Sequence, residues 1–195
     1  VSPAGGNFDE PVTQSTLKVV GAFHGLSRDR ANARRFPSID PLESWSRYRV
    51  SIDEKLVSQG KRILVKGNEV GQMMKVVGEE GTSMDDFVVY LKAEFLDSVY
   101  LQQNGFDKVD AVTGLDRQKY VFKKVSDVLS AEADFERKEE ARKTFYQMRQ
   151  LFIDWNYKAW ESNEFKDQEK KIEDFLSAHI TGLGNGREGA QKETD

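Results

Sequence analysis

The sequence contains no cysteine, and it has only four prolines and two histidines among its 195 residues. The absence of cysteine excludes disulfide bonds and thiolate zinc sites, and it is compatible with a reducing cytoplasm. No apolar run approaches the roughly 18–20 residues that a membrane-spanning helix needs, so we expect no direct membrane insertion. The first residues, Val1 to Gly6, lack the basic start and apolar stretch of a secretion signal.

Charged residues are abundant but nearly balanced in sign. The chain has 29 Lys and Arg against 33 Asp and Glu, which gives a formal net charge of -4. A general nucleic-acid binder usually shows a strong basic excess, so nucleic acid is not an expected partner. The hydrophobic fraction of 38% is enough to bury a core beneath a charged surface. The length suits one domain, or one domain with an appended arm.

No phosphate-binding loop is present in these residues. Such a loop needs G-x-x-x-x-G-K-[ST], because glycines let the backbone cradle phosphates, lysine neutralises charge and the hydroxyl binds magnesium. The nearest approach is Gly60-Lys61, where Lys55 replaces the first glycine and Arg62 replaces the hydroxyl residue. We therefore read this segment as a charged helix surface.

Metal-binding and acid–base constellations are not apparent either. His24 and His179 lie far apart and have no cysteine companions, so we expect no metal site, and we expect His179 to be partly buried on a helix face. Adjacent carboxylates such as Glu79-Glu80 and Asp85-Asp86 point about 100° apart on a helix. Solvation and helix capping explain them better than an acid–base pair, so no catalytic residue is predicted.

The hydrophobic pattern predicts a mainly α fold, a helical bundle with an extended N-terminal arm. Thr16 to Phe23 is short, β-branched and bounded by turn-formers, so it is the best strand candidate, and no partner strand of similar quality follows it. A lone strand leaves backbone groups unpaired, so either this strand pairs elsewhere or the chain is a fragment of a longer protein. The bundle helices are expected at residues 68–77, 84–103, 115–130, 134–161 and 165–179.

Three divisions of the chain follow from this pattern. Residues 1–48 form the arm, residues 49–182 form the helical domain, and residues 183–195 form a polar, flexible tail. Within the helical domain, Thr82 or Ser83 is expected to cap the helix that follows. From the residues alone, two functions remain open: an interaction module, or a piece of a larger enzyme.

Three segments carry a more specific signal. Residues 2–23 read S-P-A-G-G-N-F-D-E-P-V-T-Q-S-T-L-K-V-V-G-A-F, residues 34–40 read R-R-F-P-S-I-D, and residues 101–110 read L-Q-Q-N-G-F-D-K-V-D. In this order they resemble blocks of the catalytic A subunit (alpha chain) of V-type and A-type rotary ATPases. Direct motif matches cover about residues 2–48 and 95–120. The resemblance implies that the chain is the C-terminal portion of such a subunit.

This resemblance also implies a nucleotide site. Phe36 and Phe106 occupy the positions of two aromatic residues that lie beside the adenine of ATP or ADP in the family. The alternative is that both are core phenylalanines. The phosphate loop, the magnesium-binding carboxylate and the catalytic base would lie upstream of Val1. ATP or ADP with magnesium would therefore bind the full subunit, and we expect neither hydrolysis nor tight nucleotide binding by these 195 residues alone.

Partners follow from the same resemblance. It implies contact with B subunits of a catalytic hexamer and with central rotor stalk subunits. The chain would belong to the soluble, cytoplasmic sector of a peripheral membrane complex that couples ATP synthesis or hydrolysis to ion (proton) transport. The unpaired strand of the arm also predicts self-association of the isolated chain. The rival interpretation is a non-enzymatic helical adaptor that binds a partner helix.

Overall fold

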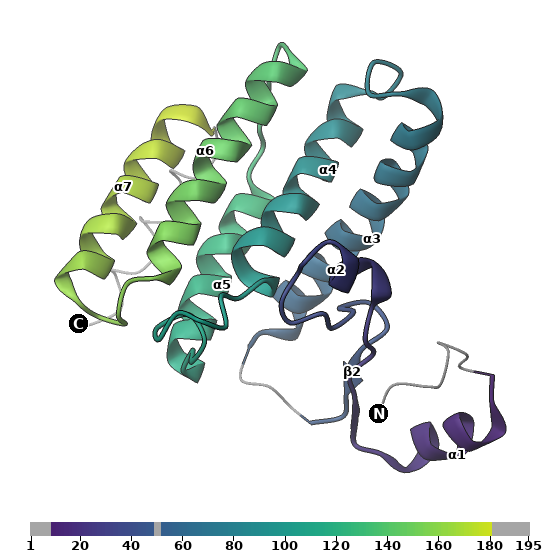
Figure 1. Cartoon of the computed structure of the whole chain (residues 1–195). Coiled ribbons are helices and arrows are strands. Elements are labelled where there is room, and N and C mark those ends of the chain that lie inside the picture. The colour runs from purple at the N-terminus through teal and green to yellow at the C-terminus, as the bar shows by residue number, and fades with distance from the viewer. Residues whose placement is uncertain (1–8, 49–51, 181–195) are drawn as a thin grey trace, which may run out of the picture.

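The computed structural model describes residues 9–48 and 52–180, and it confirms a mainly α fold (Figure 1). The short N-terminal elements are α1 (Pro11–Val19), β1 (Ala22–Phe23), α2 (Arg28–Asn32) and β2 (Trp45–Ser46). The bundle follows as α3 (Glu54–Val77), α4 (Met84–Leu96), the π-helical turn η2 (Asp97–Leu101), α5 (Leu115–Ser130), α6 (Lys138–Asn156) and α7 (Asn163–His179).

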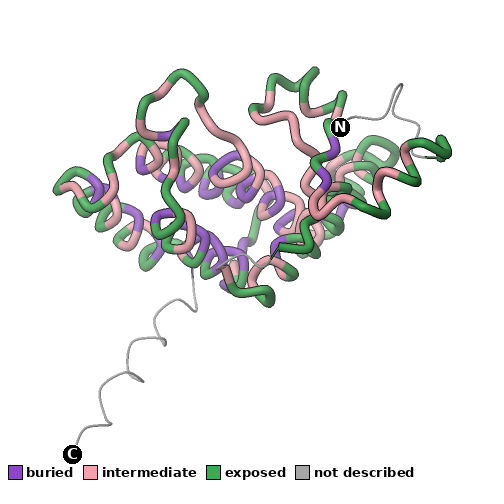
Figure 2. The backbone as a smooth tube through the Cα atoms, turned by 90° about the horizontal axis from the view of Figure 1, so that it is seen from below, coloured by how far each residue is buried: buried purple, intermediate pink, exposed green. Residues whose placement is uncertain are grey.

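The long helices pack against one another in an order that differs from the sequence, since α4 packs against α6 and α5 packs against α3. Helix α3 packs against α4, α4 against α6, and α6 against α7, while α5 contacts both α3 and α4 (Figure 1). Buried positions concentrate on the facing sides of these helices, whereas the elements before α3 are mostly exposed or half-buried (Figure 2). The hydrophobic core therefore lies in the bundle.

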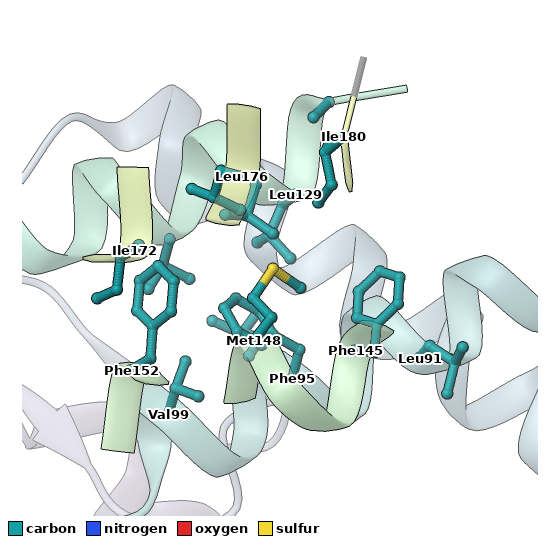
Figure 3. Close-up of a cluster of buried hydrophobic side chains, with 14 of the residues drawn as sticks. Leu91, Phe95, Val99, Leu129, Phe145, Met148, Phe152, Ile172, Leu176 and Ile180 are labelled. Carbon is teal, nitrogen blue, oxygen red and sulfur yellow. The ribbon is translucent and has the colours of Figure 1, made fainter. Parts of the chain in front are cut away.

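Aromatic and large aliphatic side chains fill the space between α4, α6 and α7. Phe95, Met148 and Phe152 lie together in this cluster (Figure 3). The Phe95 and Phe152 rings meet edge-on with centroids 5.0 Å apart, an arrangement favoured by the ring quadrupole. The buried Trp155 donates its indole N–H to the carbonyl of Phe165 at 3.1 Å, so the polar atom of this side chain is satisfied within the core.

Helix starts follow the capping chemistry of the sequence. Of the two predicted caps, Ser83 is the N-cap of α4, and its hydroxyl accepts the N–H of Asp86 at 3.2 Å. Ser162 caps α7 in the same way through the N–H of Phe165. Asp85 and Asp86 lie in the first turn of α4, where negative charge favours the helix dipole.

The predicted strand from Thr16 to Phe23 is wrong over most of its length. Thr16 to Val19 belong to α1, where Pro11 occupies the first turn and the Thr16 hydroxyl donates to the carbonyl of Val12 at 2.9 Å. Only Ala22–Phe23 is extended, and it pairs antiparallel with Trp45–Ser46. The expectation that the strand has no partner in the chain is therefore also wrong. Two-residue strands leave too little periodicity for the pattern to reveal them.

The bundle helices differ from their predicted limits in instructive ways. Helix α3 runs from Glu54 to Val77, so it joins the segment around Gly60, read as a helix surface, to the short helix expected at residues 68–77. Its glycines lie at helix contacts and do not break it. The helix expected over residues 84–103 ends at Leu96 and continues as η2. The prediction for α5 is confirmed, and that for α6 is a few residues too long at each end. The expected tail lies outside the described residues.

His179 was expected to be partly buried, and this is wrong. The side chain is exposed, and its ring stacks on that of Phe175 with centroids 4.3 Å apart. The helix face at this position points away from the core because Leu176 and Ile180 occupy the buried side.

Candidate functional site

Phe36 and Phe106 are both exposed, which excludes their interpretation as core phenylalanines. Phe36 lies in the loop after α2 with 56% of its surface accessible, and Phe106 lies in the loop after η2 and is fully accessible. Neither ring therefore contributes to the bundle core. Exposed aromatic rings of this kind offer a flat apolar face to a ligand or a partner.

The structure brings the two phenylalanine segments together. The backbone N–H of Gln103 donates to the carbonyl of Phe36 at 2.7 Å. The ring of Phe36 also lies over Gly105, where an added Cβ would come within 3.0 Å of the Phe36 Cε1 atom. A glycine at this position thus permits the close approach of the ring to the backbone directly before Phe106.

A cluster of charged side chains connects these segments to the bundle. Asp97, the first residue of η2, forms ion pairs with Arg30 of α2 and with Arg35, whose Nε lies 3.2 Å from the carboxylate. Arg35 also donates to the side chain of Gln102 at 2.6 Å and to the hydroxyl of Ser98 at 3.3 Å. The ion-paired side chains of Arg30 and Asp97 are only 14% exposed, so water screens their attraction weakly.

The loop that carries Phe106 is ordered by two aspartates. The Asp107 carboxylate accepts the N–H groups of Asp110 and Val109, both at 2.9 Å, and these hydrogen bonds lower the pKa of Asp107. The Asp110 carboxylate accepts the N–H of Asn104 at 2.6 Å, while burial raises the pKa of Asp110. The Asn104 side chain in turn accepts the N–H of Phe106 at 3.1 Å. This short loop therefore has a defined conformation despite its exposure.

A polar cavity of about 240 Å³ lies behind this loop, between η2 and α5. Arg117 reaches its wall and is 4% exposed, and burial lowers its pKa. Its guanidinium donates to the carbonyl of Asn156 at 2.6 Å, at the end of α6. Neither phenylalanine lines this cavity. Both side chains are exposed outside this cavity.

An exposed aromatic ring can stack on any flat π-system. Among residues 9–48 and 52–180 there is no group of three or more acidic or histidine side chains arranged to hold a metal. In the same ranges, no helix is long and apolar enough to cross a bilayer.

Sequence reasoning missed the arginine cluster. Arg35 and Gln102 are 67 residues apart, so no local pattern links them. Asp97 comes directly after α4, and in the sequence nothing distinguishes it from an ordinary surface aspartate. The one available signal was the position of Arg35, directly before a phenylalanine that the resemblance had already singled out.

Comparison with known proteins gives consistent matches. Residues 54–149 match the family model described as the C-terminal domain of V and A type ATP synthase. The V-type ATP synthase alpha chain 1 of Treponema pallidum is 55% identical over 189 residues, which cover 97% of this chain and 32% of that protein. The alpha chain of Treponema denticola is 52% identical over 94% of this chain and 31% of its own length. The corresponding chain of Borreliella burgdorferi is 52% identical over 91% and 31%.

The chain thus spans about a third of the length of these relatives. Among solved structures, the ATP synthase subunit NeqB from Nanoarcheaum equitans superimposes with a TM-score of 0.55 at 19% identity. That match covers 66% of this chain and 34% of the other, and at this identity it supports the fold alone.

Proposed function

Because this chain belongs to the family of V and A type ATP synthase alpha chains, of which it represents the C-terminal portion, we propose that it forms the adenine side of a nucleotide site. The reaction of the whole assembly is ATP synthesis or hydrolysis coupled to ion transport. Residues 1–48 would complete the nucleotide-binding domain, and residues 49–182 would form the helical domain that links nucleotide turnover to the rotor. The assembly would lie on the cytoplasmic side of the membrane, in the peripheral sector.

The observation that carries this proposal is the pairing of two exposed phenylalanines from distant segments. The hydrogen bond from Gln103 to Phe36 and the ring contact at Gly105 fix one aromatic residue beside the loop that bears the other. A purine that stacks on such a surface gains roughly 1–3 kcal/mol per base. The site supplies the flat apolar surface that a base requires, and the rest of the nucleotide would contact residues outside this chain.

In this function the phenylalanines bind and orient the base but take no part in bond making. The base does not change during phosphoryl transfer, so its contacts stabilise the ground state and the transition state equally. Magnesium, when bound with ATP, would neutralise charge on the phosphates. The residues of this chain would contribute affinity, and groups elsewhere in the complex would contribute the chemistry.

The helical domain is proposed to contact B subunits and central stalk subunits as a single packed unit. The core that runs from α3 through α7 supports this role, because a continuously packed bundle transmits a displacement at one end to the other. The similarity to alpha chains over most of the chain supports this role over the rival interpretation as an independent helical adaptor.

The test uses the full-length alpha chain in the assembled ATPase. Phe36→Ala and Phe106→Ala should each raise the KM for ATP by roughly 5- to 150-fold, which corresponds to the loss of 1–3 kcal/mol of stacking. The kcat should stay within about twofold, because uniform binding is lost and transition-state contacts are kept. Tyr146→Ala is the matched control, since Tyr146 is an aromatic residue of α6 with 59% exposure. Unchanged ATP affinity with a large loss of kcat would contradict adenine contact.

A further inference from the structure

We propose that Arg35 and Asp97 are positioning residues that hold Phe36 and Phe106 in the arrangement a base requires. This inference rests on the proposed nucleotide site. Neither residue needs to touch the nucleotide. Their side chains join the segment that ends in Phe36 to the helical turn that begins the Phe106 loop.

The side chain of Arg35 contacts three residues in η2 and directly after it. Its guanidinium contacts the carboxylate of Asp97, the hydroxyl of Ser98 and the side chain of Gln102. A planar guanidinium presents several N–H donors in a fixed fork, so these contacts restrict its orientation as well as its position. Because Phe36 is the next residue, the backbone before this ring is fixed relative to η2.

Asp97 fixes the other phenylalanine segment from within η2. Its backbone carbonyl accepts the N–H of Gln102 at 2.9 Å, which closes the π-helical turn. The following residue, Gln103, then donates to the carbonyl of Phe36. π-helical turns occur frequently at functional sites, and here the turn directs the chain from α4 into the Phe106 loop.

Arg30 adds a second connection between the same two segments. It lies in α2, which Ser27 caps, and pairs with the same carboxylate as Arg35. The intervening Arg34 has a φ of 56°, in the left-handed region, where the chain turns between α2 and Arg35. Two arginines on either side of a tight turn thus converge on one poorly exposed carboxylate.

Removal of the Arg35 side chain should therefore let the Phe36 segment move relative to the Phe106 loop, while both phenylalanine side chains remain. In the assembled ATPase, Arg35→Ala should raise the KM for ATP by at least about threefold, within the range of coupling between contacting residues. The kcat should remain within about twofold. Arg35→Lys keeps the charge opposite Asp97 but loses the fork, so its KM should lie between those of wild type and Arg35→Ala.

A double-mutant cycle separates positioning from a merely structural role. In a Phe36→Ala, Phe106→Ala background, Arg35→Ala should raise the KM no further, since there are no rings left to position. Arg142→Ala, which removes an arginine from its ion pair with Glu79 at a distance from this site, is the matched control and should leave KM unchanged in both backgrounds.

Each result decides between the alternatives. If the phenylalanine variants leave the KM unchanged, the nucleotide site itself is wrong and the positioning role falls with it. If they raise the KM but Arg35→Ala does not, or raises it by the same factor in both backgrounds, only the positioning role is overturned. A lower kcat and melting temperature at constant KM would also overturn it. Should the Arg35→Ala complex fail to assemble, Arg35→Lys completes the same cycle.

Discussion

Gly67 of α3 lies directly against Ala93 of α4, and its replacement by alanine should drive these helices apart. A Cβ atom at Gly67 would lie 2.2 Å from the Cβ of Ala93. Carbon atoms in contact prefer separations of about 3.5–4.0 Å, so the two helices would have to move by more than about 1 Å. No rotamer change relieves this overlap, because a Cβ has a fixed position on the backbone.

Two effects of opposite sign determine the size of the loss. Overpacking a well-packed contact typically costs about 1–3 kcal/mol, and the severity of this overlap favours the upper part of that range. Alanine in a helix interior is better than glycine by about 1 kcal/mol. The net expectation is a loss of about 1–2 kcal/mol. For a chain of this length, the melting temperature should fall by roughly 2–8 °C.

Thermal unfolding of the 195-residue chain, followed by circular dichroism, is the assay. Gly60→Ala is the matched control in the same helix, because its Cβ would lie 3.5 Å from Leu96 Cδ2 in ordinary contact. It should raise stability by up to about 1 kcal/mol. Adding Ala93→Gly to Gly67→Ala should relieve the overlap and recover much of the loss. A Gly67→Ala chain as stable as wild type would refute this account of the α3–α4 contact.

Further expectations concern pH, activity and the N-terminal arm. Burial raises the pKa of Tyr100 to about 12, so the neutral phenol stabilises the folded state below pH 10. This stability, on the order of 2–3 kcal/mol, should be lost as pH rises from 10 to 12, and Tyr100→Phe should flatten that part of a pH–stability curve. The purified 195-residue chain should show no magnesium-dependent phosphate release; release that a point change within the chain abolishes would count against this. Calorimetry should find ATP or ADP binding at millimolar level or weaker, because stacking supplies roughly 1–3 kcal/mol and a millimolar constant requires about 4; a micromolar constant would contradict it. Removal of residues 1–24 should leave the bundle folded, as thermal unfolding would reveal, because the buried cluster lies in the bundle helices; unfolded helices would show that the arm belongs to the core.

The sequence predicted those parts of the fold that depend on local chemistry. The cap of α4 was expected at Thr82 or Ser83, and Ser83 takes that role because its hydroxyl lies next to the N–H groups it satisfies. The predictions failed where tertiary contacts decide. Nothing in the sequence indicated that Gly67 lies where a neighbouring helix leaves no room for a side chain. The β-branched residues of α1 suggested a strand, but intrinsic propensity is weak where nothing is buried.

The candidate site likewise contains some residues that the sequence indicated and others that only the folded structure reveals. The resemblance pointed to Phe36 and Phe106, and the structure adds that they are exposed and that their segments are hydrogen-bonded. The residues that hold the segments together could not be predicted, because Arg35 and Asp97 belong to elements that meet only in the folded chain. An ion pair between distant positions leaves no periodicity for a pattern to detect.

Photolabelling with an azido derivative of ATP, reactive at the adenine ring, tests the nucleotide site most directly. The assembled ATPase, with the full-length alpha chain, would be labelled and digested, and the modified residues would be located by mass spectrometry. Adducts within residues 34–37 or 103–108 that excess unmodified ATP suppresses are the predicted result. Labelling that spares both segments while it modifies other parts of the complex would contradict the assignment of Phe36 and Phe106 to the adenine.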